Sequence, residues 1–283
     1  MLSKIFSSYW LIRIYDNLKR NGLKGFIKNS FFFLNRVFNP KILGELPFAV
    51  YFDKRRRLIR KLCNQELKNF DNPNIKSFFN YYLDESIIKQ DSVIYSFGLS
   101  NSINFELDIV KKKNVKVFCY DPTDSSVNYF KKNKFENIFF HPYGLFTENK
   151  EIEFFMSDSG NGSIVKEIMT GDNISKKKFQ CYTLKTLMDK NNHDKIDVLK
   201  MDIDGVEKEV LYQMIQEKIY PSQISVEFES PLVDLNKVID NHNDIKKIIN
   251  YIKENNYSAY HMPRFSNKPY DSVEVLFLRK IQN

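Results

Sequence analysis

The hydrophobic residues of this chain gather in short runs separated by polar stretches, a pattern that predicts buried β-strands alternating with amphipathic helices. The clearest example lies between Asp91 and Asp121. We expect four consecutive elements there, a strand, a turn, a partly buried helix and a second strand, over residues 92–97, 99–102, 105–111 and 115–120. The first strand ends at Gly98, and the second ends at Asp121.

This strand–turn–helix–strand unit predicts a ligand site at the carboxyl ends of its two strands. Backbone amides point outward at the start of the helix, and Asp121 follows the second strand. Open α/β sheets bind nucleotide-like ligands at such an edge, and a carboxylate there suits the two hydroxyls of a ribose. The same pattern also occurs in α/β proteins that bind nothing at this point, so a purely structural role of Gly98 and Asp121 stays open.

A second segment, residues 196–207, strengthens the prediction of a site. Its first half is a buried type of strand, and its second half opens a helix. Asp202 therefore lies at the carboxyl end of a strand, on the same edge as Gly98 and Asp121. Asp204 and Glu207 have the spacing of a helix N-cap and its returning acid, so we expect both mainly to shape the turn.

The rest of the chain continues the alternation of strands and helices. A helix through Phe78 and Tyr82 leads into the first strand, and the loop Gly160-Asn161-Gly162 is a mobile segment able to cover the site. Further strands are expected over 138–141, 152–156 and 224–229, with helices around 127–132 and 245–252 and a closing hairpin of 257–261 and 272–279. Such an order predicts a doubly wound, mostly parallel α/β sheet with an antiparallel last strand.

Charge is concentrated at the N-terminus. The 283 residues have a net charge of +8, and residues 1–61 hold 14 Lys and Arg against three acidic residues. From Leu2 to Leu18, apolar and aromatic residues recur at helical spacing with basic residues between them. Such a helix either lies in an anionic membrane surface or packs on protein, within its own chain or in a homodimer.

The domain organisation follows from this asymmetry. The basic cluster 53–61 lies on a predicted helix that runs to about Phe70, and it forms either a solvated face or a contact to phosphate groups. Polar residues then break the chain, so we expect a helical N-terminal extension over 1–72 and an α/β domain over 73–283.

The cysteines and the N-terminal segment indicate the cellular compartment. Cys63, Cys119 and Cys181 are far apart and show no paired spacing for a metal or a disulfide. The segment 1–38 has no apolar block long enough to span a bilayer and no cleavage site of a signal peptide. We therefore expect a cytoplasmic protein, in contact with the inner face of the membrane if the N-terminal helix binds lipid.

Four motifs resemble the FkbM type of S-adenosylmethionine-dependent methyltransferases, across about residues 90 to 280. The most specific is the run Leu199-Lys200-Met201-Asp202-Ile203-Asp204-Gly205-Val206-Glu207. The others are Val93-Ile94-Tyr95-Ser96-Phe97-Gly98, Phe118-Cys119-Tyr120-Asp121-Pro122-Thr123 and Thr183-Leu184. Two positions depart from the family pattern, because Ser100 stands where a second glycine is usual and Asp204 where glutamate is common.

The resemblance implies a Rossmann-like fold with a seven-stranded sheet and S-adenosylmethionine as cofactor. It implies that the Gly98 turn holds the methionine part of the cofactor, that Asp121 binds the ribose hydroxyls and that Asp202 borders the methyl group. The residues expected to contact the cofactor are Phe97, Gly98, Ser100, Asn101, Asp121, Pro122, Thr123, Tyr143, Gly144 and Asp202. The family also implies O-methylation of a sugar hydroxyl in a bacterial surface glycan or a related metabolite, so a glycan or another small molecule is the expected acceptor. The basic segment 1–61 suits an acceptor held on a membrane-bound lipid carrier.

A sugar hydroxyl is a poor nucleophile at neutral pH, so a base or a metal is expected beside it. We expect Asp202 as the leading acid at the methyl centre, with Glu229 or His261 as base or acceptor ligand. Two alternatives remain, a glycan-binding or scaffolding protein on a degenerate methyltransferase fold and a methyltransferase of nucleic acid or protein. Enzymes that methylate exocyclic amines often carry an Asn/Asp-Pro-Pro-aromatic turn after the fourth strand, where this chain has Asp202-Ile203-Asp204-Gly205, so no nucleic-acid partner is expected.

Overall fold

The structure is a computed structural model that describes residues 48–99, 102–157, 162–166, 174–229, 233–262 and 272–280. The predicted N-terminal amphipathic helix and residues 158–161 of the predicted mobile loop, which runs from Ser157 to Ser163, lie outside these residues. In the part of the chain that is described, no helix is long and apolar enough to cross a membrane.

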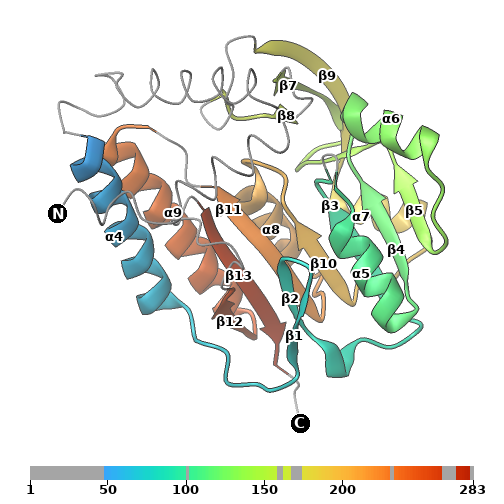
Figure 1. Cartoon of the computed structure of the whole chain (residues 1–283), viewed down its shortest axis with the longest axis horizontal. Coiled ribbons are helices and arrows are strands. Elements are labelled where there is room, and N and C mark those ends of the chain that lie inside the picture. The colour runs from blue at the N-terminus through green and yellow to red at the C-terminus, as the bar shows by residue number, and fades with distance from the viewer. Residues whose placement is uncertain are drawn as a thin grey trace, which may run out of the picture.

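A seven-stranded sheet forms the centre of the molecule (Figure 1), in the order β12-β13-β11-β10-β3-β4-β5. Its strands are β3 Val93–Phe97, β4 Lys116–Tyr120, β5 Ile138–His141, β10 Val198–Met201, β11 Gln223–Glu229, β12 Tyr257–His261 and β13 Ser272–Arg279. Neighbouring strands from β5 to β11 are parallel, and β13 runs antiparallel to both β11 and β12. This arrangement confirms the predicted doubly wound, mostly parallel sheet with an antiparallel last strand.

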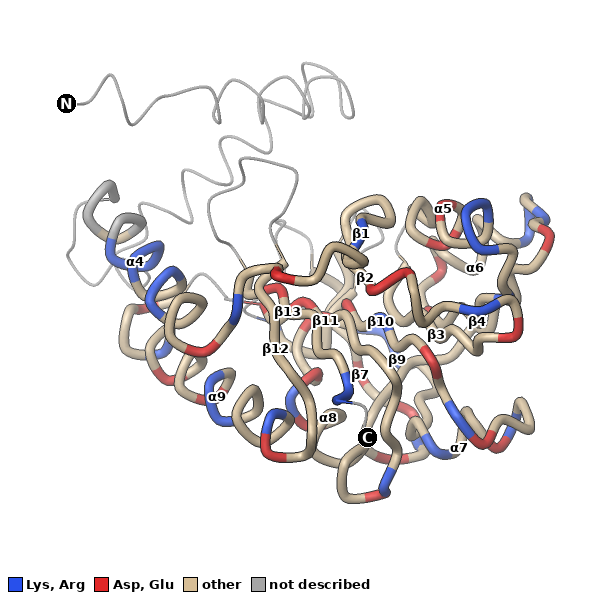
Figure 2. The backbone as a smooth tube through the Cα atoms, turned by 90° about the horizontal axis from the view of Figure 1, so that it is seen from below, with Lys and Arg blue, Asp and Glu red and all other residues tan. Residues whose placement is uncertain are grey.

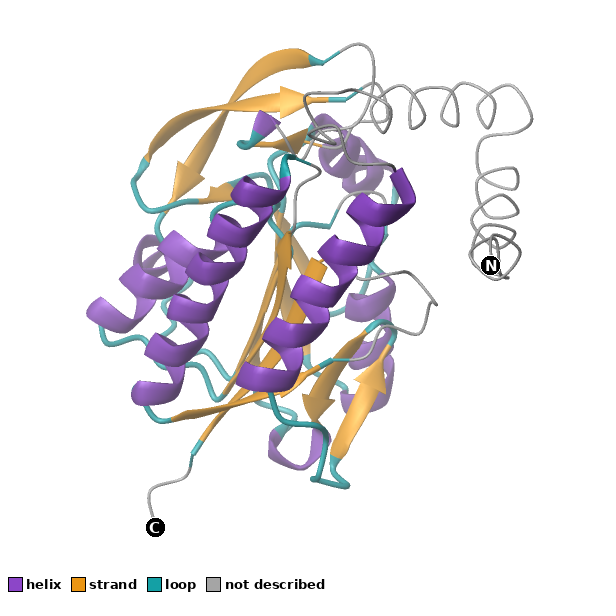
Figure 3. Ribbon diagram, turned by 90° about the vertical axis from the view of Figure 1, so that its left-hand side faces the viewer, coloured by secondary structure: helices purple, strands orange, loops and turns teal. Residues whose placement is uncertain are grey.

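Helices cover both faces of the sheet (Figure 3), which explains why β3 and β10 are almost continuously apolar. One hydrophobic core joins the sheet to α4 Phe48–Glu66, α7 Leu184–Lys190, α8 Glu207–Gln216 and α9 Leu235–Glu254. The opposite core joins it to α5 Asn104–Lys113, α6 Asp124–Lys132 and a hairpin of β1 Ile75–Phe78 and β2 Tyr81–Asp84.

The hairpin corrects the prediction of a helix through Phe78 and Tyr82. Phe78 pairs with Tyr81 across a two-residue turn, and Phe79 has a left-handed φ of 54° that a helix does not allow. Asp84 at the end of the hairpin exchanges two hydrogen bonds with the side chain of Gln223 on β11, at 2.9 and 3.2 Å. The hairpin is thus fixed to the sheet before the first parallel strand begins.

A second, four-stranded sheet stands beyond the carboxyl ends of the parallel strands. It contains β6 Gly144–Leu145, β7 Lys150–Met156, β8 Gly162–Ser163 and β9 Ser175–Tyr182, in the order β6-β9-β7-β8. Of these strands only β7 was predicted. β9 has no hydrophobic signal in its first half, because its first four residues are polar and exposed.

Helix α4 ends at Glu66, earlier than the predicted Phe70, because the next segment pairs with the edge of the main sheet. Lys68 donates to the Ala259 carbonyl and accepts from the His261 amide, both at 2.9 Å. Of the basic cluster on α4 (Figure 2), Arg55 is buried, while Lys54, Arg57, Arg60 and Lys61 are exposed. Since α4 packs in the same core as the sheet, no break in packing marks residue 72, and the domain boundary there stays a prediction.

Candidate functional site

The site is built on the turn after β3. Gly98 has a φ of +77°, and a Cβ on it would lie 1.7 Å from the Asp202 carbonyl oxygen. The ends of β3 and β10 are held together by the Asp202 amide, which donates to the Phe97 carbonyl at 3.1 Å. Only glycine fits this position, because both the left-handed backbone and the close approach exclude a side chain.

Asp121 ties the Gly98 turn to the end of β4. Its Oδ2 accepts a hydrogen bond from the Leu99 amide at 2.9 Å. Its Oδ1 accepts from the amide and the hydroxyl of Thr123, at 2.8 and 2.6 Å. The carboxylate is only 5% exposed, so these donors hold a buried negative charge in one fixed orientation beside the turn.

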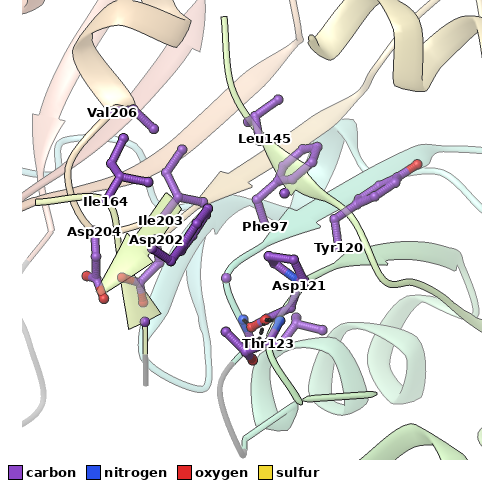
Figure 4. Close-up of a pocket in the computed structure, with 16 residues that line it drawn as sticks. Phe97, Tyr120, Asp121, Thr123, Leu145, Ile164, Asp202, Ile203, Asp204 and Val206 are labelled. Atoms are coloured by element: carbon purple, nitrogen blue, oxygen red, sulfur yellow. Dashed lines mark hydrogen bonds between the residues drawn. The ribbon is translucent and has the colours of Figure 1, made fainter. Parts of the chain in front are cut away.

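A cavity of about 170 Å³ opens above these residues (Figure 4). Asp202 and Asp204 lie on one side of it, and Asp121 lies on the other. The four-stranded sheet contributes the roof, through residues such as Leu145 and Phe154. The lining consists of Phe97, Gly98, Leu99, Tyr120, Asp121, Pro122, Thr123, Gly144, Leu145, Phe154, Gly162, Ile164, Asp202, Ile203, Asp204 and Val206.

Most of the residues expected to hold a cofactor line this cavity. They are Phe97, Gly98, Asp121, Pro122, Thr123, Gly144 and Asp202. Tyr143 is not part of the lining, because its ring packs edge-on against Tyr182 at 5.0 Å. Ser100 and Asn101 lie outside the described residues.

The turn after β10 differs from the predicted helix cap. Val206 is the N-cap of α8, and Asp204 stands before it with a left-handed φ of 54°. Glu207 does shape the turn, because its carboxylate accepts from the Gly205 amide at 3.1 and 3.2 Å. Asp204 instead lines the cavity, where burial and the charges of Asp202 and Glu207 raise its pKa well above the usual range.

Asp202 has two cationic or proton-donating neighbours. The Tyr81 hydroxyl donates to its Oδ2 at 2.8 Å, and the Lys200 ammonium lies 3.9 Å from the same oxygen. Asp202 and Asp204 are therefore in unlike surroundings although both line the cavity. Asp204, whose pKa is raised, is placed to hold a proton, whereas Asp202 faces a hydrogen-bond donor and a cation.

The two other predicted catalytic residues lie farther from the cavity. Glu229 ends β11, next to β10, and burial together with the neighbouring acids Glu227 and Asp204 raises its pKa to about 9. His261 ends β12, which β13 and β11 separate from β10. Three strand spacings separate the backbone of β12 from that of β10 by about 14 Å, which argues against His261 as the base.

Three polar residues of the site were missed at the level of sequence, Tyr81, Lys200 and Ser163. Lys200 left a signal, since a lysine within the buried run of β10 is unusual. Tyr81 left none, because its hairpin was interpreted as a helix. The hydroxyl of Ser163 on β8 donates to the Asp204 carbonyl at 2.5 Å, joining the roof of the cavity to the turn after β10.

Comparison with known protein families places these features in one of them. The sequence model of the methyltransferase FkbM domain matches residues 73–259. The chain belongs to the FkbM methyltransferase family. The motifs around Gly98, Asp121 and Asp202 that carry the resemblance are those that surround the cavity, so this methyltransferase has its family motifs gathered at one site.

Several solved structures are similar to this chain at low sequence identity and low TM-score. A putative rRNA methylase from Clostridium thermocellum is 10% identical, with a TM-score of 0.40, over 69% of this chain and 90% of that one. Fibrillarin from Methanococcus jannaschii is 14% identical, with a TM-score of 0.41, over 75% and 77%. The plantazolicin methyltransferase BpumL in complex with SAH is 12% identical, with a TM-score of 0.36, over 96% and 99%. Comparison with curated proteins finds no match.

Proposed function

We propose that this methyltransferase uses S-adenosylmethionine to methylate a hydroxyl of a sugar, in a surface glycan or a related metabolite. The observation that carries the proposal is the joint placement of the Gly98 turn, the Asp121 carboxylate and the Asp202 carboxylate around one cavity. The family supports methyl transfer, and the acidic side of the cavity supports a neutral, hydroxyl-bearing acceptor over a phosphate-bearing one.

The residues at the cavity fit the cofactor. Gly98 lines the cavity, and its lack of a side chain lets the turn lie directly against the Asp202 backbone, so that the ends of β3 and β10 border the same space. Asp121 would accept hydrogen bonds from the ribose hydroxyls, and the apolar side chains of Leu145, Phe154 and Ile164 would cover the base. When bound, S-adenosylmethionine would supply a methyl group activated by a sulfonium, and the neutral thioether S-adenosylhomocysteine would be the leaving group.

On the acceptor side, the chain supplies position and a proton acceptor. Asp202 would accept the hydrogen bond of the acceptor hydroxyl and take its proton as the oxygen–methyl bond forms. Asp204, with its raised pKa, would stay protonated and donate a hydrogen bond to another oxygen of the sugar. Because a protonated Asp204 carries no charge, it does not repel a negative charge on the neighbouring Asp202.

Methyl transfer to defined acceptors tests the proposal. We would incubate the full chain with S-adenosyl[methyl-³H]methionine and a panel of methyl glycosides of hexoses and 6-deoxyhexoses, and measure the labelled glycosides. Transfer to at least one glycoside, lost in Asp202→Asn, is expected. Cofactor binding without transfer to any glycoside would contradict the sugar assignment, and absence of cofactor binding would favour a glycan-binding or scaffolding role.

A further inference from the structure

The hairpin before the first parallel strand places the side chain of Tyr81 against Asp202, which lines the cavity. Tyr81, the first residue of β2, donates its hydroxyl to Asp202 Oδ2 at 2.8 Å. Its ring packs edge-on against Phe105 of α5 at 5.2 Å. The other end of the hairpin is fixed by the paired hydrogen bonds between Asp84 and Gln223. Tyr81 is thus held on two sides, and its hydroxyl has little freedom to leave Asp202.

Lys200 joins the same oxygen of Asp202 to the Gly98 turn. Its ammonium is 3.9 Å from Asp202 Oδ2 and donates to the carbonyls of Phe97, at 3.2 Å, and Gly98. It also lies 5.1 Å from the centre of the Tyr81 ring, within the range of a cation–π contact. The side chain is only 4% exposed, so water does not screen these interactions.

Charge explains why such a pair is needed at this place. Asp204 and Glu207 lie near Asp202, and their interaction with it disfavours a second negative charge. The Tyr81 hydroxyl donates a hydrogen bond to Asp202, and the Lys200 ammonium places a positive charge beside it. They act on Oδ2 alone, and the other oxygen, Oδ1, accepts no hydrogen bond from the described residues.

We propose that Tyr81 and Lys200 are positioning residues that hold the Asp202 carboxylate in place, so that Oδ1 faces the acceptor hydroxyl while Lys200 keeps Asp202 in register with the cofactor turn. The inference rests on the proposed function, because it assigns the acceptor to the Asp202 side of the cavity. Its physical basis is the steep dependence of rate on geometry, since a misplacement of about 1 Å can lower turnover about a hundredfold.

The decisive variant is Tyr81→Phe, which removes one hydroxyl and keeps the ring against Phe105. With the glycoside that turns over best in the panel, we expect kcat to fall about tenfold to a hundredfold, with the KM for the glycoside and the Kd for S-adenosylmethionine within about threefold of wild type. Tyr82→Phe is the matched control, because Tyr82 is the next residue on β2 and its ring packs at a tilt against Phe70, with the ring centres 4.9 Å apart. Tyr82→Phe is expected to keep wild-type turnover.

Lys200→Met tests the second half of the proposal by calorimetry without an acceptor. Because Lys200 also holds the Phe97 and Gly98 carbonyls, we expect this variant to weaken binding of S-adenosylmethionine by at least about tenfold, unlike Tyr81→Phe. Equal cofactor affinities of Lys200→Met and wild type would overturn the link to the turn.

A double-mutant cycle on thermal unfolding needs neither cofactor nor acceptor. Tyr81→Phe and Asp202→Ala should lower Tm by less in combination than the two separate changes predict, because each removes the same hydrogen bond. Additive changes in Tm, or an unchanged kcat in Tyr81→Phe, would overturn the positioning role. Failure of the wild type to bind S-adenosylmethionine would instead overturn the proposed function, so the two failures are distinguishable.

Discussion

Replacing Gly98 with alanine should damage both the fold and the site. A left-handed φ costs an alanine about 1–2 kcal/mol relative to glycine. The new Cβ would lie 1.7 Å from the Asp202 carbonyl oxygen, so the ends of β3 and β10 must separate by more than about 1 Å, and overpacking of this kind costs about 1–3 kcal/mol. We therefore expect a loss of about 2–5 kcal/mol in the free energy of unfolding.

Urea denaturation followed by circular dichroism measures this loss, with Gly162→Ala as the control. At Gly162 the nearest atom to a new Cβ is the Met156 sulfur at 2.5 Å, the flexible end of a side chain that is able to move. We expect that control to lose less than about 1 kcal/mol. Equal urea midpoints for the two variants would refute the reasoning, because the close approach of Gly98 to Asp202 would then have no energetic consequence.

Three other outcomes follow from the site and the surface. Asp202→Asn should lower kcat about a hundredfold while changing the Kd for S-adenosylmethionine little, which steady-state kinetics and calorimetry measure, and wild-type turnover would place the base elsewhere. The pKa of Glu229 is raised to about 9 in the folded protein, whereas the unfolded chain releases this proton near pH 4.5. The free energy of unfolding of the wild type therefore falls as pH rises from about 4.5 to about 9. The Tm of Glu229→Gln minus the Tm of wild type should therefore be larger by about 3 °C or more at pH 8.5 than at pH 5. The same difference at both pH values would contradict the raised pKa. The full chain should sediment with anionic liposomes and be released by salt, whereas a chain without residues 1–47, which keeps α4 in its core, should sediment less. Equal sedimentation of the two chains would contradict membrane attachment.

The parallel sheet was predictable from the sequence because its strands are buried on both faces. β3 and β10 read as apolar runs, and each is followed by a residue with a special role, Gly98 and Asp202. Since parallel strands end at one edge, Gly98, Asp121 and Asp202 were predicted on the same edge of the sheet. These residues line the cavity in the structure.

The residues whose positions were predicted wrongly are those placed by tertiary structure. The aromatic residues between Phe78 and Tyr82 fit both a helical and an extended period, so the hairpin that carries Tyr81 had no distinct pattern. His261 was expected near Asp202 because both end strands, but the order of strands in a sheet is not readable from periodicity. The left-handed backbone of Asp204 depends on contacts such as the bond from Ser163, which is far away in sequence.

Calorimetric titration with S-adenosylmethionine tests the central claim most directly, on the wild type, Asp121→Ala and Asp124→Ala. Asp124 is a matched control, because it is exposed and paired with Lys177 outside the cavity. The wild type and Asp124→Ala should bind one equivalent with equal affinity, and Asp121→Ala should bind more weakly by about 1–3 kcal/mol, the value of hydrogen bonds to a charged group. No heat of binding with the wild type, or one affinity shared by all three proteins, would contradict the account.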